Sequence, residues 1–249
     1  MNSTLLVSLL AEVMPRSPQN GYFGVLLYAF GLLLVLFLLI NLDRRFREYI
    51  VRSLVRPFNF FADVRDRRIL PNGQTTLLAL ICSGAFGISV ATLVHGYAAD
   101  PAAAPYFYTM FPRAVYDPIK GFLWDYAALL IATTAMSFIA IFFVALLLRL
   151  WAMFVRGRFY FADTYNVAAW SVLPIALLLA YDLILPRLDM DQPTAMLSLA
   201  VIGALFIWSY FRVLKGTGVL FDIYPTKIYG YGVLALALFA FLVFLFLQK

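Results

Sequence analysis

Cysteine and histidine are almost absent from this chain of 249 residues, in which Cys82 and His95 are the only examples. A single cysteine excludes an internal disulfide. One cysteine and one histidine are too few for a His/Cys zinc site, an iron–sulfur cluster or a bis-histidine haem. The sequence also lacks a glycine-rich phosphate loop, a Gly-x-Ser-x-Gly elbow and a His-Glu-x-x-His helix. We therefore expect a non-enzymatic protein without a metal or another cofactor.

Charged residues are also scarce, at 13% of the chain, whereas 64% of the residues are hydrophobic. The mean hydropathy of +0.89 is too high for a water-soluble globule. No Pro/Gly/Ser-rich linker, low-complexity tract or soluble domain interrupts the apolar segments. The composition predicts an integral membrane protein whose partners are lipids and other membrane proteins, not nucleic acid.

Six apolar segments approach or exceed the roughly 20 residues that a helix needs to cross a bilayer. They comprise residues 22–42, 75–97, 121–155, 167–185, 194–214 and 229–248. Because lipid offers no hydrogen-bond partner to the main chain, each of them should be helical. The expected fold class is all-α, a polytopic membrane bundle of six transmembrane helices. Pro174 should kink the fourth helix and free the carbonyl of Trp170.

Arginine and lysine gather on one side of this predicted bundle. Fourteen of the nineteen basic residues fall in the segments around 43–74, 149–166 and 212–228, and only Arg16, Arg113, Lys120, Arg187 and Lys249 fall on the other side. Basic residues favour the cytoplasmic side of a membrane. We therefore expect both termini to lie outside. Residues 1–20 do not follow the order of a signal peptide, so the first span is interpreted as an uncleaved anchor.

The segment after the first span combines arginine with large apolar side chains. On a helix, Phe46, Ile50, Val51, Leu54 and Val55 form one stripe, and Pro57 should end that helix. This pattern is typical of an amphipathic helix with its apolar side in the membrane interface and its arginines at lipid phosphates. The predicted lipid- or partner-binding residues are Arg44, Arg45, Arg47, Arg52, Arg56, Arg65, Arg67, Arg68, Arg156 and Arg158. A stop-transfer cluster that only sets topology, and a surface for an acidic partner, are the alternatives.

Three ionisable residues lie near the predicted outer ends of the spans: His95, Asp125 and Asp182. One interpretation places them in the headgroup zone, solvated and without a functional role. The alternative is a shallow polar pocket open to the outside, in which Asp125 or Asp182 pairs with His95. Ionisable residues inside a membrane often mark transport paths, so this pocket would suit a small transporter or, less directly, a lipid-modifying enzyme.

Two short motifs resemble the Yip1-domain membrane proteins of bacteria. LVRPFNFFADV at 54–64 is similar to the segment that precedes the first helix of that family, and FYFADTYNVAAWSVLP at 159–174 is similar to a later loop. The resemblance covers about residues 52–248. It implies five spans after a cytoplasmic N-terminal region, and a bacterial inner membrane. The chain has an extra first span and lacks the Asp-Leu-Tyr-Gly-Pro type motif of eukaryotic members, so the resemblance does not extend to Rab-type GTPase partners.

Together these features predict two parts. Residues 1–74 comprise a tail, the first membrane anchor and the basic amphipathic segment, and residues 75–249 form a five-helix Yip1-like membrane domain. The expected function is that of a scaffold or accessory subunit which contacts anionic lipid or partner proteins through its arginine-rich cytoplasmic side. The alternative is a small transporter or permease-like subunit that uses the polar groups near the outer side.

Overall fold

The computed structural model describes residues 19–66, 72–99, 121–123, 125–154, 159–185 and 192–247, and every regular element in these ranges is helical. The longer helices are α2 (Gln19–Leu42), α5 (Asn72–Ala99), α8 (Tyr126–Ala152), α11 (Gln192–Leu220) and α12 (Pro225–Leu247). The shorter ones are α3 (Arg44–Val55), α4 (Pro57–Arg65), α9 (Phe161–Ser171), the 3-10 segment η1 (Leu173–Leu177) and α10 (Leu178–Asp182). The all-α prediction is confirmed for the described residues.

Five segments of the described chain are long and apolar enough to cross a membrane: Phe23–Leu42, Asn72–Gly96, Tyr126–Ala152, Phe161–Asp182 and Thr194–Leu220. They overlap the first five predicted spans, although the third begins at Tyr126 instead of residue 121, the fourth begins at Phe161 instead of residue 167, and the fifth continues to Leu220. The sixth predicted span corresponds to α12, which is helical but is not among these five. A sixth span therefore stays a prediction.

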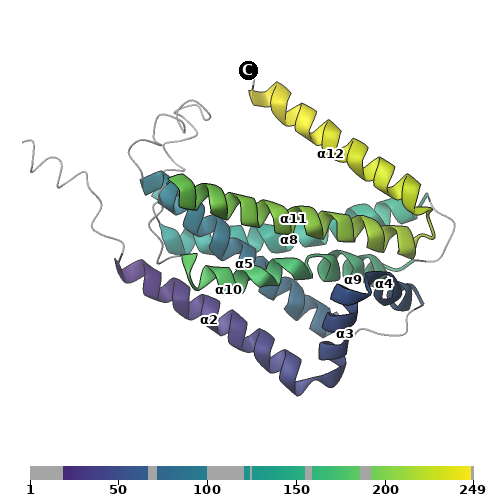
Figure 1. Cartoon of the computed structure of the whole chain (residues 1–249), viewed down its shortest axis with the longest axis horizontal. Coiled ribbons are helices and arrows are strands. Elements are labelled where there is room, and N and C mark those ends of the chain that lie inside the picture. The colour runs from purple at the N-terminus through teal and green to yellow at the C-terminus, as the bar shows by residue number, and fades with distance from the viewer. Residues whose placement is uncertain are drawn as a thin grey trace, which may run out of the picture.

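The bundle has a buried centre and an apolar exterior. The spans Asn72–Gly96 and Phe161–Asp182 are largely buried, whereas only a small share of the other three candidate spans is buried inside the protein. Helix α5 runs beside α8, and α12 leaves the end of α11 and runs away from the other helices (Figure 1). Helix α12 contacts α11 at Tyr210, whose hydroxyl donates a 2.8 Å hydrogen bond to the carbonyl of Gly232. An apolar exterior is what a helix bundle presents to lipid.

Helices α5 and α8 approach closely at Gly87. A Cβ atom at this position would lie 3.0 Å from the main-chain N and Cα atoms of Thr134. The adjacent Thr133 hydroxyl donates a 3.1 Å hydrogen bond to the Gly87 carbonyl. Small residues at helix interfaces in membranes permit this kind of contact between main chains. Gly87 therefore sets the distance between α5 and α8.

The fourth span is interrupted near its middle. Helix α9 ends at Ser171, and η1 begins at Leu173 with Pro174 in its first turn. Proline has no N–H, so it cannot donate to the carbonyl of Trp170, and the N–H of Ile175 donates instead to Val172 at 2.9 Å. The predicted kink at Pro174 thus takes the form of a 3-10 segment that joins α9 to α10.

Helices α3 and α4 belong to the same core as the membrane spans. The rings of Phe46, Tyr49 and Phe60 surround Trp170 of α9, with centroid distances of 5.7, 6.3 and 5.0 Å. Phe46, Phe60 and Trp170 are members of one buried hydrophobic cluster. Residues on both sides of the predicted division at 74/75 therefore contribute to a single core.

Candidate functional site

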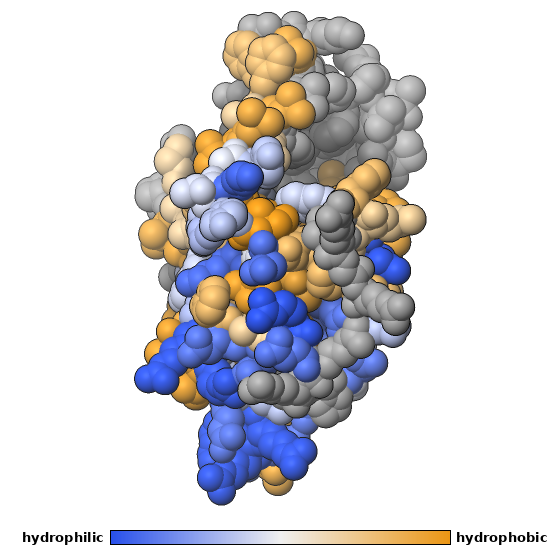
Figure 2. All heavy atoms as spheres, turned by 90° about the vertical axis from the view of Figure 1, so that its right-hand side faces the viewer, coloured by the Kyte–Doolittle hydropathy of each residue, from blue (hydrophilic) through white to orange (hydrophobic). Residues whose placement is uncertain are grey.

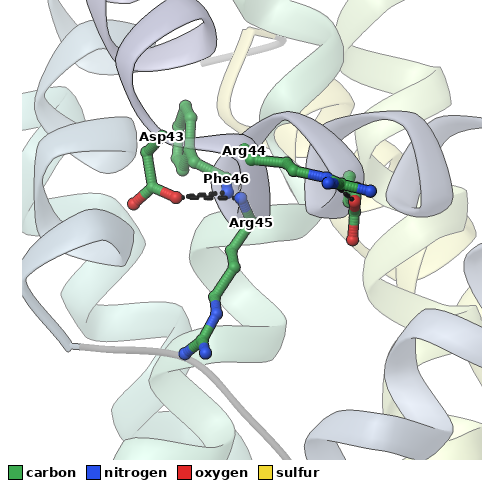
Figure 3. Close-up of polar contacts among 5 residues, drawn as sticks. Asp43, Arg44, Arg45 and Phe46 are labelled. Atoms are coloured by element: carbon green, nitrogen blue, oxygen red, sulfur yellow. Dashed lines mark hydrogen bonds and ion pairs between the residues drawn. The ribbon is translucent and has the colours of Figure 1, made fainter.

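The N-terminus of α3 is capped by Asp43, the residue that separates this helix from α2. Asp43 has an extended main chain, and one of its carboxylate oxygens accepts hydrogen bonds from the N–H groups of Arg45 and Phe46 at 2.9 and 3.1 Å (Figure 3). Its other oxygen accepts from Gln74 at the start of α5. An aspartate in this position stabilises a helix start by satisfying N–H groups that have no partner within the helix. The cap turns the chain sharply out of the α2 direction.

Helix α3 spans Arg44–Val55, and Pro57 lies in the first turn of α4, so the prediction that Pro57 ends the amphipathic helix is confirmed. Its apolar stripe is divided between two environments. Phe46 is fully buried against Trp170, and Ile50 and Leu54 pack on the same cluster. Val51 and Val55 are 54% and 71% exposed. The expectation that the whole stripe faces lipid is therefore wrong, because the aromatic core of α9 covers its Phe46 side.

The same packing changes the chemistry of Tyr49. Burial raises the pKa of its hydroxyl above the ordinary value, because the ring lies between Phe60 and Trp170. Arg45 and Arg52 act in the opposite direction with a smaller effect. The position of α3 is thus set by ring packing and by the Asp43 cap, and its arginines are free to face outward.

We call the exposed arginines of α3 and α4 and of the junction between them the basic face, which consists of Arg44, Arg45, Arg47, Arg52, Arg56 and Arg65. Hydrophilic residues gather over the lower and middle part of the end of the molecule that carries α3 and α4 (Figure 2). Arg44 forms an exposed pair with Glu48 at 3.0 Å, and Arg52 pairs with Asp63 of α4. Arg67, Arg68, Arg156 and Arg158 lie outside the described residues.

Arg45, Arg47 and Arg56 are exposed and form no ion pair with any described residue. An exposed arginine without a carboxylate beside it keeps its full attraction for phosphate. A pair such as Arg44–Glu48 is worth little at a hydrated surface and exchanges easily for another anion. The basic face therefore combines a fixed scaffold with several guanidinium groups that are available to an anionic ligand.

His95, Asp125 and Asp182, the three ionisable residues predicted near the outer side, each bond a different part of the chain. Asp125 is exposed and caps α8, and one carboxylate oxygen accepts hydrogen bonds from the N–H groups of Ala127 and Ala128 at 3.1 and 3.2 Å. His95 is half-buried, with Nδ1 3.2 Å from the carbonyl of Leu123. Asp125 thus lies just before α8, at the end of the span as predicted, and stabilises the helix N-terminus.

Asp182 differs from the other two because it is fully buried at the end of α10. Its Oδ1 accepts a 2.5 Å hydrogen bond from the Ser89 hydroxyl, and its Oδ2 has no hydrogen-bond partner among the described residues. The interpretation of Asp182 as a solvated headgroup residue is wrong, because its side chain is buried in the protein and bonded to Ser89 of α5. The hydrogen bonds of Asp182 and His95 go to Ser89 and Leu123, so the described contacts do not join them in one pocket.

A buried arginine that sequence reasoning did not single out lies within α11. Arg212 is 4% exposed, and its guanidinium donates to four oxygens of two other parts of the chain. On one side it bonds the carbonyl and the hydroxyl of Ser53 at 2.8 and 2.5 Å. On the other side it bonds the carbonyls of Trp170 and Ser171 at 3.0 and 3.3 Å. In a continuous helix these two carbonyls would accept from the N–H groups of residues 174 and 175. Pro174 has no N–H, and Ile175 donates to Val172 instead.

Two signals in the sequence pointed toward this contact. Pro174 predicted a free carbonyl at Trp170, and Arg212 is a charge close to the end of an apolar segment. The predicted fifth span ended at residue 214, which assigned Arg212 to the cytoplasmic charge cluster. The structure extends α11 to Leu220, so Arg212 lies two turns inside the helix, where it needs internal acceptors.

No protein-family model, curated protein or solved structure matches this chain. The resemblance of 54–64 and 159–174 to Yip1-domain proteins therefore stays a prediction.

Proposed function

We propose that this chain is a non-enzymatic, multi-pass membrane protein that acts as a scaffold or accessory subunit and binds anionic lipid headgroups through its basic face. The observation that carries the proposal is a set of exposed arginines on a helix held rigidly by a cap and by ring packing. Arg45, Arg47, Val51 and Val55 are all exposed on a helix whose buried side is already occupied by protein. A partner protein with an acidic surface would meet the same charges.

The test measures which lipids stay bound to the full-length chain after extraction in a mild detergent. Native mass spectrometry of the purified protein should show phosphatidylglycerol in excess over zwitterionic lipids. Replacement of Arg44, Arg45 and Arg47 together by glutamine should remove most of this excess, since each basic residue near an anionic surface contributes roughly 1 kcal/mol. Higher salt should act in the same direction.

A control variant removes a positive charge that lies outside the basic face. Lys227 is an exposed residue of α12, and Lys227→Gln should leave the lipid excess unchanged. If the triple variant retained the same lipids as the unmodified chain, the arginines would be topology signals only and the proposal would be wrong.

A small transporter or permease-like subunit is the second candidate, and Asp182 favours it. This carboxylate is buried, has one oxygen without a partner among the described residues, and lies at the end of the interrupted fourth span. Interrupted spans with buried ionisable residues are common in transporters. In that case Asp182→Asn should abolish a proton-driven flux in reconstituted vesicles and Asp182→Glu should retain it, whereas a scaffold would lose no lipid binding in either variant.

A further inference from the structure

A pocket lies where the end of α11 and the start of α12 meet α4. Its volume is about 570 Å³. The charged residues in its wall are Arg65 of α4, Lys215 of α11 and Asp222 of the connecting turn. Most of the remaining wall is apolar, with Ile223, Ile228 and Tyr229 among its members. The pocket thus offers two cations to a ligand from different helices within a mostly apolar enclosure.

The two cations are neutralised only in part. Arg65 lies 3.2 Å from Asp66, and its Nη1 is 3.9 Å from the carboxylate of Asp222. Lys215 is half-buried and has no hydrogen bond or ion pair with any residue of the described ranges. A half-buried ammonium group in an apolar setting gains from an anion that enters beside it, because water solvates it incompletely there.

Asp222 is held at the rim by an unusual main-chain conformation. It is the one non-glycine residue with a positive φ among the described residues, at 53°. The N–H of Ile223 donates back to the carbonyl of Gly218 at 2.9 Å, which ends α11 in a Schellman-type turn. The side chain of Asp222 is 95% exposed as a result. The carboxylate is therefore displayed at the entrance and does not cross the pocket to pair with Lys215.

We propose that this pocket binds the phosphate of one anionic phospholipid, with Lys215 and Arg65 as its ligands. The proposal rests on the proposed function, since it names one defined lipid site at the edge of the basic face, which contributes Arg65 to it. The apolar wall and the exposed rings of Phe58 and Tyr224 at its edge, 57% and 75% exposed, suit the glycerol and acyl portions of a lipid better than a free phosphate ion. Aromatic side chains at membrane interfaces commonly occupy this depth.

The test is a titration of the full-length chain in mild detergent with dioleoyl phosphatidylglycerol, with the first bound lipid followed by native mass spectrometry. Lys215→Gln and Arg65→Gln should each raise the Kd of that first lipid roughly fivefold, the equivalent of about 1 kcal/mol per basic residue. Asp222→Asn should lower this Kd, because the substitution removes the negative charge at the rim. Asparagine also tolerates a positive φ, so the main chain should keep its conformation. Binding of dioleoyl phosphatidylcholine should change little in all three variants.

Lys227→Gln is the matched control, since Lys227 lies in the first turn of α12 but does not line the pocket. Its Kd for phosphatidylglycerol should equal that of the unmodified chain. Equal losses in Lys215→Gln and Lys227→Gln would indicate diffuse charge attraction and would overturn the pocket. Displacement of the lipid by inorganic phosphate at comparable concentration would also overturn it, because the ligand would then be the free ion. The triple arginine variant of α3 tests the basic face separately and should retain this first lipid.

Discussion

Arg212 is a buried cation that bonds main-chain oxygens instead of a carboxylate. Three of its four acceptors are carbonyls, and none of the ion pairs among the described residues involves it. The planar guanidinium can reach Ser53 on one edge and Trp170 and Ser171 on the other, a geometry that lysine cannot reproduce with a single ammonium group. One side chain thus links α3, the broken fourth span and α11.

We expect Arg212→Met to lower the free energy of unfolding by about 2–4 kcal/mol, because three buried carbonyls lose their only side-chain donor. Arg212→Lys should recover part of this loss. The single thiol of the chain provides the measurement: Cys82 is 1% exposed, so its reaction with a maleimide dye during a temperature ramp reports unfolding in detergent.

Arg149→Met serves as the control, since Arg149 is a half-buried arginine near the end of α8 that makes no hydrogen bond with any described residue. Its Tm should stay within a few degrees of the unmodified chain. If both variants unfolded at the same temperature, the bonds of Arg212 would contribute nothing to stability.

At the scale of elements, the contact of α5 with α8 depends on the absence of a side chain at Gly87. We expect Gly87→Val to lower Tm, with a loss of about 1–3 kcal/mol, because the new carbons would overlap the main chain of Thr134 and separate the two helices. Thermal reactivity of Cys82 again supplies the readout, since this residue lies on α5.

Gly203→Val is the appropriate comparison for this substitution. Gly203 lies within α11, and a Cβ atom there would have no neighbour within 4 Å. Valine at that position should be tolerated with little change in Tm. A similar fall in both variants would mean that valine disturbs these helices irrespective of the space around it.

At the scale of the whole molecule, we expect α3 and the start of α8 to lie on opposite sides of the membrane, as the distribution of arginine predicts. In a Cys82→Ser background, Glu48→Cys should react with a membrane-impermeant maleimide only after the cells are opened, and Phe122→Cys should react in intact cells. Both positions are exposed, so the protein itself does not hide the thiol. Reaction of Glu48→Cys in intact cells would reverse the predicted orientation.

Length and composition were sufficient to predict five helical spans, because lipid forces apolar segments of this length to be helical. Pro57 is a local signal and was sufficient to predict the end of α3, whereas the cap at Asp43 was not predicted. The division of the α3 stripe was not readable, since only the fold brings Trp170 beside Phe46. The burial of Asp182 was also missed, because a position near the end of a span does not reveal which neighbouring helix covers it.

The sequence likewise predicts only part of the candidate site. The exposed arginines of the basic face are visible in the sequence, but the role of Arg212 depends on acceptors 41, 42 and 159 residues away. Likewise, the α11–α12 pocket requires Arg65 and Lys215 to meet across separate helices. Pairings over such distances are set by packing and leave no regular spacing in the chain.

The contacts of Arg212 also impose an order on biosynthesis. Ser53, Trp170 and Ser171 all leave the ribosome before Arg212 does, and the bond to Ser53 spans 159 positions of the chain. Until α11 is inserted, the carbonyls of Ser53 in α3 and of Trp170 and Ser171 in the fourth span therefore lack the side-chain donor that Arg212 supplies. We therefore expect the contact of α3 with the fourth span to be completed only late in synthesis, after α11 has been inserted beside them.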